Sequence, residues 1–181
     1  AGAGVVVVAA KRGWPWWQNS NAARASDQDY AAPDEAEKND MAGAQKALDE
    51  VIASGNGGYP TLAKFREAAL LAHEGNTVGA VAAYDTLSTT ESNQHLRELA
   101  LVLAANLLVD NGDVASVQQR VGGLISPDNP MRNTARESIG LTQYRAGDLN
   151  AELATFNDIV ADPLSSSDQQ SRMRIYVAQL V

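Results

Sequence analysis

Apolar residues recur at steps of three and four along most of the chain beyond residue 60. The stretches FREAALLAHEG (65–75), LVLAANLLVDNG (101–112) and SIGLTQYRAGD (138–148) each place them on one face of a helix. A glycine-containing break ends each stretch, and a second helical pattern follows the break. The pattern therefore predicts pairs of amphipathic helices joined by short turns.

These pairs repeat along the chain. The segments GNTVGAVAAYDTL (75–87), GDVASVQQRVGGL (112–124) and GDLNAELATFNDI (147–159) align without gaps, and a weaker copy begins at Asn39. The openings lie 36, 37 and 35 residues apart (39 to 75, 75 to 112, 112 to 147). Each of the three aligned segments places large apolar residues nine and twelve positions after its glycine, at Tyr84, Val121 and Phe156 and at Leu87, Leu124 and Ile159.

Each repeat is expected to be a helix, a turn and a second helix. We expect the glycine to adopt the left-handed conformation that ends the first helix, and the following Asp or Asn to cap the second. A small residue seven positions before each glycine (Ala68, Ala105 and Gly140) allows a neighbouring helix to approach closely. Neither helix can bury its apolar face alone, so adjacent pairs must stack. The predicted hairpins are 19–55, 59–89, 93–125 and 131–161, with a capping helix at 168–181 that covers the last hairpin with Met173, Val177 and Leu180.

The spacing resembles a tetratricopeptide repeat. That family's pattern has a small residue before the turn, Gly-Asp at the turn, Ala five positions later and an aromatic residue nine positions later. Gly75, Asn76, Ala80 and Tyr84 match it in one copy. Ile139-Gly140, Tyr144, Gly147-Asp148 and Phe156 match it in another. The resemblance implies an all-α fold, a right-handed superhelical stack of helical hairpins forming an α-solenoid.

Composition narrows the possible partners. The 181 residues include no cysteine, which excludes disulfides, thiolate metal sites and cysteine nucleophiles. The formal net charge is −8, and the lysines and arginines are scattered singly, so we expect no binding to nucleic acid.

No enzyme motif is present in the sequence. His73 and His95 are expected to be ordinary residues on helix surfaces, because neither has ligands at metal-binding spacing. Asp113 and Asp148 fit helix caps, and the other acidic residues are interpreted as a solvated face. We therefore predict no catalytic residues, no cofactor, no metal and no small-molecule substrate.

The N-terminal stretch VVVVAAKRGWPWWQNS (5–20) permits three interpretations: a core strand, a cleaved leader or the end of a membrane helix. Residues 1–10 would span only about 15 Å as a helix, half of a bilayer core. We favour the interpretation that residues 1–18 are the truncated end of a membrane anchor and its junction. In this interpretation the apolar residues form the outer half of the membrane helix, and Trp14, Trp16 and Trp17 lie at the membrane interface. A cleaved leader fits the sequence less well, because leaders place their cations before the apolar run, whereas Lys11 and Arg12 follow it. Lys11 and Arg12 would favour the cytoplasmic side, so an outward orientation requires more basic residues upstream.

A second resemblance covers nearly the whole chain. Gly13-Trp14, Trp16-Trp17, the segment AARASDQDY (22–30) and Gly58-Tyr59 are similar in layout to the ancillary subunit family of the Sec translocon. That family has one N-terminal membrane helix followed by tetratricopeptide-like hairpins in the periplasm. The resemblance implies a single-pass protein of the bacterial inner membrane, largely periplasmic, that assists protein export together with translocon subunits and periplasmic chaperones.

Stacked hairpins present their first helices on a concave surface suited to protein ligands. In the predicted register, Phe65, Asn106, Leu141 and Arg145 face this groove. Phe65 and Leu141 could equally be core residues. The alternative function is a soluble helical-repeat adaptor or oligomerisation module with no role at a membrane.

Overall fold

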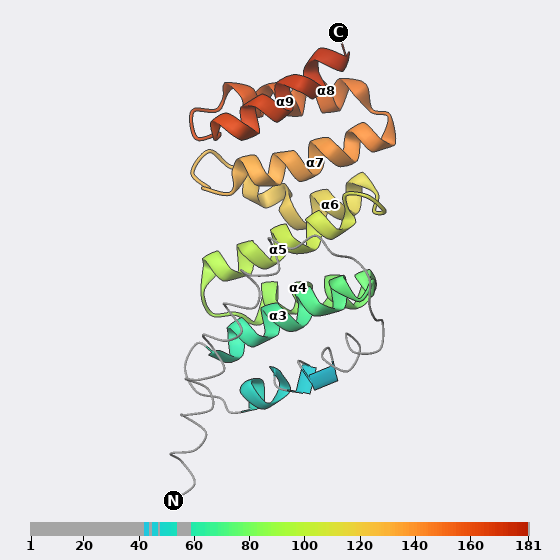
Figure 1. Ribbon diagram of the computed structural model, residues 1–181. Helices are drawn as coiled ribbons and strands as arrows, with labels where there is room; N and C mark the ends of the chain where they lie inside the picture. Colours follow the sequence, from blue (N-terminus) through green and yellow to red (C-terminus); the bar gives the residue numbers. More distant parts are fainter. Residues whose placement is uncertain (1–41, 44, 47, 54–58, 181) are drawn as a thin grey trace, which may run out of the picture. The chain divides into compact units, whose positions relative to one another are not determined.

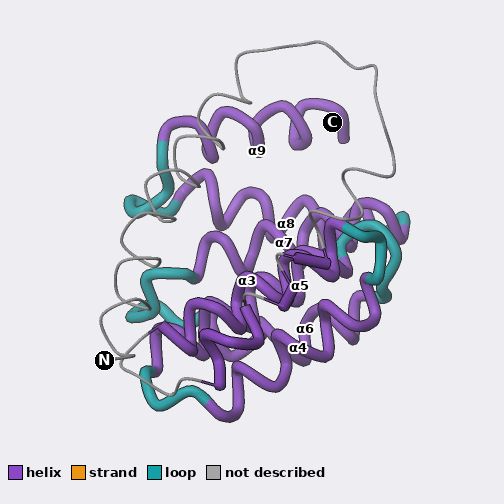
Figure 2. The backbone as a smooth tube through the Cα atoms, turned by 60° about the horizontal axis from the view of Figure 1, so that its bottom comes forward, coloured by secondary structure: helices purple, strands orange, loops and turns teal. Residues whose placement is uncertain are grey.

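The computed structural model describes residues 42–43, 45–46, 48–53 and 59–180, all within one structural unit, residues 40–181. The described residues at 42–53 are helical. Seven α-helices and a short 3-10 helix follow, connected by loops (Figures 1 and 2), and the described residues contain no strand. The helices are α3 (Tyr59–His73), α4 (Thr77–Thr90), α5 (Gln94–Leu108), α6 (Val114–Val121), η1 (Gly122–Ile125), α7 (Arg132–Ala146), α8 (Leu149–Ala161) and α9 (Ser167–Leu180). The predicted all-α fold is therefore confirmed for this part of the chain.

The helices from α3 to α9 stack in the order of the sequence (Figure 1). Each α-helix packs against the next along the chain, and α5 also contacts α7. This is the arrangement of a helical repeat; the right-handed superhelix stays a prediction. The predicted anchor (1–18) and its interface residues Trp14, Trp16 and Trp17 lie outside the described residues, as does most of the first predicted hairpin. Within the described ranges, none of the helices is both long and apolar enough to span a bilayer.

Polar caps begin the second helix of each hairpin. The side chains of Asn76, Asp113 and Asp148 accept hydrogen bonds from the backbone amides of Gly79 (3.0 Å), Ser116 (2.6 Å) and Ala151 (3.2 Å), respectively. These bonds satisfy amides that have no partner inside the helix. The predicted caps are confirmed.

The glycines before these caps differ among themselves. Gly75 (φ 79°) and Gly147 (φ 76°) adopt the left-handed conformation that ends α3 and α7. The same expectation is wrong for Gly112, which does not have a positive φ. A Cβ there would lie 2.8 Å from the carbonyl oxygen of Leu108, which also accepts the Gly112 amide hydrogen bond at 2.6 Å. Glycine is therefore needed at this turn for close backbone approach.

Three apolar clusters form the core of the described unit. The six apolar positions predicted from the repeat are all buried, with exposed fractions between 0% and 6%; they are Tyr84, Leu87, Val121, Leu124, Phe156 and Ile159. Ala68 and Ala105 are also fully buried, and a methyl group on Gly140 would overlap the ring of Phe156. The small residues thus permit the close packing that the spacing predicts.

Ion pairs connect successive layers of the stack. Arg120 of α6 donates two hydrogen bonds to the carboxylate of Asp85 in α4, at 2.9 and 2.7 Å. Arg172 of α9 is 2.9 Å from Glu137 of α7. In both pairs the partners are 35 residues apart, which is one repeat.

The last helix, α9, covers the α7–α8 hairpin. Met173 is fully buried with Phe156 and Ile159, and Val177 packs against that cluster. The predicted covering role is confirmed for these two residues. The side chain of Leu180 lies outside the described residues.

Candidate protein-binding site

A groove with a volume of about 670 Å³ lies between α3 and α5. Side chains from α3, α4, α5 and the α4–α5 loop line it: Thr61, Leu62, Phe65, Arg66, Ala69, Tyr84, Glu91, Ser92, Asn93, Leu96, Leu99 and Leu103. Seven of these twelve are apolar or aromatic residues from α3, α4 and α5. The groove can therefore hold apolar side chains.

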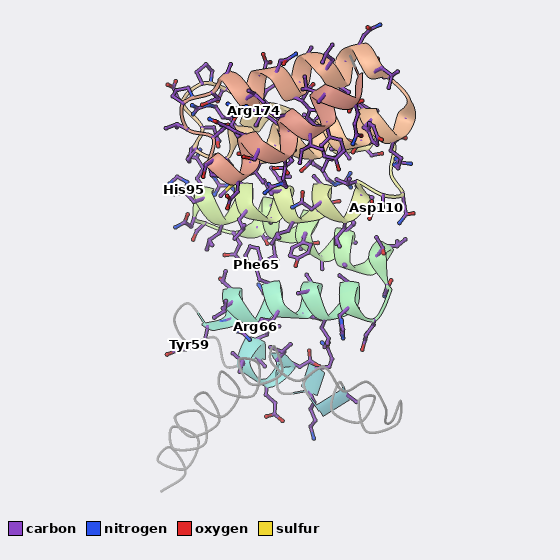
Figure 3. The ribbon with its side chains drawn as sticks, turned by 45° about the horizontal axis from the view of Figure 1, so that its top comes forward. Tyr59, Phe65, Arg66, His95, Asp110 and Arg174 are labelled. Atoms are coloured by element: carbon purple, nitrogen blue, oxygen red, sulfur yellow. The ribbon has the colours of Figure 1, made fainter. Side chains whose placement is uncertain are left out.

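The base of the groove is built from aromatic and aliphatic side chains. The rings of Phe65 and Tyr84 lie 6.0 Å apart, and Phe65 lies on the side of α3 that faces α4 and α5 (Figure 3). Tyr84 is only 5% exposed, and this burial raises the pKa of its hydroxyl. Leu62, which also lines the groove, is 43% exposed. Exposed apolar surface of this kind is available to a ligand.

Hydrogen bonds hold the mouth of the groove in place. Thr61 donates its hydroxyl proton to the Glu91 carboxylate at 3.0 Å, which joins the start of α3 to the α4–α5 loop. The guanidinium of Arg97 donates to the backbone carbonyls of Glu91 and Ser92, both at 2.9 Å. The loop therefore has a defined position before any ligand binds.

The four groove residues predicted from the sequence lie on α3, α5 and α7, but only Phe65 lines this groove. Asn106 accepts a hydrogen bond from the Ser138 hydroxyl (2.7 Å), and Arg145 donates to the carbonyls of Val109 and Gly112. Leu141 is partly buried against the cluster around Phe156. In the structure these three side chains connect the helices, and their contact with a ligand stays a prediction.

Four leucines that line the groove were not predicted from the sequence: Leu62, Leu96, Leu99 and Leu103. A signal for two of them was available. Leu62 and Leu99 both stand thirteen residues before the glycine of their hairpin (62 to 75, 99 to 112). Apolar residues at matching positions of adjacent first helices face the same side of the stack.

A second, smaller pocket of about 210 Å³ lies on the other side of the first turns of α5, and its lining residues are Gln94, His95, Glu98, Ser126, Asp128, Asn129 and Pro130. Glu98 is 7% exposed. One of its oxygens (Oε1) accepts a hydrogen bond from Gln94 at 2.8 Å, while the other (Oε2) accepts none. The Nδ1 atom of His95 is 3.7 Å from that second oxygen. His95 has a 73% exposed side chain, as expected for a surface residue.

The prediction that the remaining acidic residues form a solvated face is wrong at three positions. Glu98, Glu152 and Asp162 are all buried. Glu152 is fully buried with no hydrogen bond to either oxygen, and burial raises its pKa. Asp162 accepts two hydrogen bonds from Arg132 (2.6 and 2.7 Å) and one from Arg136 (2.9 Å). The Arg132 contact is the main reason why the pKa of Asp162 lies far below its usual range.

None of these carboxylates forms a recognisable metal centre. Across the described ranges, no three His, Asp or Glu side chains are grouped so that they could hold a metal ion. Asp162 is neutralised by two arginines, and Glu152 is enclosed without a second ligand.

Comparison with known proteins identifies the family. The model of the tetratricopeptide repeat-like domain matches residues 1–128, which include the whole groove. No curated protein and no solved structure matches the chain. Tetratricopeptide repeat-like domains typically act as scaffolds that bind other proteins. The match spans well over half of the sequence, and the chain therefore belongs to the tetratricopeptide repeat-like family.

Proposed function

We propose that this chain is a non-catalytic protein-interaction module and that its α3–α5 groove binds an apolar segment of a partner protein. The observation that carries this proposal is a preformed groove lined by leucines and aromatic residues, on adjacent first helices of the repeat. Ligand sites are commonly concave and mainly apolar, with a few polar groups that set orientation. Thr61, Glu91 and Asn93 supply such polar groups at the rim.

The geometry also explains why the site suits a peptide segment. The groove lies between two helices and is open to solvent rather than enclosed, so an extended segment can enter it. The hydrogen bonds of Thr61 and Arg97 fix the α4–α5 loop, which lowers the ordering cost of binding. Burial of Leu62 and its neighbours by a partner would supply the apolar contribution to affinity.

Selection from a random 12-residue peptide library tests this function. The full chain should retain peptides enriched in Leu, Phe, Trp or Tyr, and amide signals of α3 and α5 should shift when such a peptide is added in an NMR titration. Peptides without apolar enrichment would contradict the proposal, as would shifts that avoid α3 and α5.

The finer proposal concerns location. We propose that the module is tethered to the bacterial inner membrane, faces the periplasm and assists export at the Sec translocon with periplasmic chaperones. The residues that support it are those of the N-terminal junction, Gly13-Trp14 and Trp16-Trp17, through their resemblance to the ancillary translocon subunits. Cell fractionation with detergent extraction, followed by protease access from each side, tests it. Recovery in the soluble cytosolic fraction would contradict the tether and favour a soluble adaptor.

A further inference from the structure

We infer that the partner segment carries a basic side chain, whose ammonium or guanidinium group binds the pocket formed by Glu98, His95 and Asp128. This inference rests on the proposed function, because it names the chemistry of the segment that binds the neighbouring groove. The pocket lies between the first turns of α5 and the loop from Ser126 to Pro130.

The lining of this pocket favours a cation. Two carboxylates, Glu98 and Asp128, line it, and no lysine or arginine does. Arg132 is near enough for the charge of Asp128 to contribute to its raised pKa. Its guanidinium, however, donates hydrogen bonds to Asp162 at 2.6 and 2.7 Å and not to Asp128. The amides of His95 and Leu96, in the first turn of α5, donate to the Asn93 side chain and are therefore not free to bind an anion.

Glu98 is the specific indication of a ligand. The residue is more than nine-tenths buried, and its Oε2 atom accepts no hydrogen bond. A buried carboxylate oxygen without a donor is costly, and a cation bound beside it offsets that cost. The imidazole of His95 is 3.7 Å from this oxygen, beyond hydrogen-bond distance. Because 73% of the His95 side chain is exposed, the ring is free to turn aside for an incoming group.

The groove and the acidic pocket meet at the start of α5. Asn93 and Leu96 line the groove, whereas Gln94 and His95 line the acidic pocket. A helix is about 10 Å across, so an extended peptide needs about three residues to pass over it. A segment with an apolar residue in the groove can therefore place a basic residue in the pocket about three positions away.

Titration of the full chain with arginine amide, followed by amide NMR, tests the pocket without any partner. Both probes are acetylated at the α-nitrogen so that neither carries an α-ammonium charge, and citrulline amide is then the neutral probe of nearly the same shape. We expect saturable shifts at residues 94–98 and 126–130 with arginine amide and none with citrulline amide. Equal shifts with both probes, or shifts spread evenly over the acidic surface, would overturn the inference.

Variants make the test specific. Glu98→Gln keeps the side-chain shape and the acceptor for Gln94, and it should weaken binding of arginine amide at least tenfold. Asp128→Asn, in the exposed loop, should weaken it as well and serves if Glu98→Gln alters the fold. Asp110→Asn is the control, because Asp110 is exposed at the opposite end of α5 from His95 (Figure 3). Undiminished binding by both Glu98→Gln and Asp128→Asn would overturn the inference.

The peptide library separates this inference from the proposed function. Selection by the unmodified chain should give peptides with Arg or Lys about three positions from an apolar residue. Selection by Glu98→Gln should keep the apolar enrichment and lose the basic one. Apolar enrichment alone in both selections would overturn the basic-residue inference and leave the groove intact. If neither selection gives peptides enriched in apolar residues, the proposal that the groove binds an apolar segment is wrong, even if arginine amide binds the acidic pocket.

Discussion

Glu152 stands one helical turn before Phe156 on α8, and both side chains are fully buried. Glu152 lies five residues after Gly147, the position that Ala80 and Val117 occupy in the two preceding hairpins. Neither of its carboxylate oxygens has a hydrogen-bond partner. The α7–α8 hairpin therefore contains a buried acid where the two preceding hairpins have the apolar side chains of Ala80 and Val117.

Replacing this acid should stabilise the protein. Glu152→Met keeps a similar volume and removes the unsatisfied carboxyl, so we expect the free energy of unfolding at pH 7 to rise by about 1–3 kcal/mol. Glu74→Met is the control, since Glu74 is exposed and should change stability by less than about 0.5 kcal/mol. Urea denaturation of both variants measures the difference; a clear loss of stability in Glu152→Met would contradict this account.

The same residue makes a prediction about pH. Burial raises the pKa of Glu152 in the folded state, so the folded protein holds this proton more tightly than the unfolded chain. Its contribution to stability is complete below the unfolded pKa and is lost as the pH rises through the folded pKa. The advantage of Glu152→Met should therefore shrink as the pH falls toward 4. An advantage that is independent of pH would show that ionisation is not the cause.

Asp162 should have the opposite dependence. Its folded pKa is lowered, mainly by the hydrogen bonds from Arg132, so its contribution is present above the unfolded pKa and lost as the pH falls through the folded one. Asp162→Asn leaves Arg132 and Arg136 without their shared carboxylate. We expect the melting temperature at pH 7 to fall by roughly 10 °C, and the difference from the parent to narrow in acid. Asp158→Asn, at an exposed position of α8, the helix that ends just before Asp162, should have little effect.

Substitution of Gly140 tests how closely α7 and α8 must pack. Alanine normally favours a helix, but a methyl group here would overlap the ring of Phe156. We expect Gly140→Ala to destabilise the fold by about 1–3 kcal/mol in urea denaturation. Gly122→Ala is the matched control, because a methyl group there meets no atom within 4 Å. Equal stability of the two variants would show that α7 can move away from Phe156 at little cost.

Local signals accounted for much of the fold. The caps at Asn76, Asp113 and Asp148 could be predicted because each depends on bonds to an amide three residues away. The buried positions could be predicted because the repeat places them at fixed distances from the glycines. The backbone conformation of Gly112 was predicted wrongly. A glycine before an aspartate indicates a tight turn, but it does not show whether a positive φ or a close backbone contact requires the glycine.

The candidate site was harder to predict. An apolar residue on a first helix can face the core or the groove. The repeat places Leu62 and Leu99 at matching positions, but it does not indicate which of these two surfaces they face. Asn106 and Arg145 are polar residues whose bonds to the neighbouring layer depend on how the hairpins stack. The burial of Glu98 and Glu152 likewise depends on segments distant in sequence, which periodicity does not describe.

Substitution of a groove leucine tests most directly whether the α3–α5 groove binds partner segments. Two exposed leucines allow a matched comparison: Leu62 (43% exposed) lines the groove, and Leu149 (52% exposed) does not. Fluorescence anisotropy with a library-selected peptide should show that Leu62→Ser weakens binding about fivefold, the loss expected for roughly 1 kcal/mol of apolar contact, while Leu149→Ser leaves it unchanged. Equal affinity of the two variants would contradict the account.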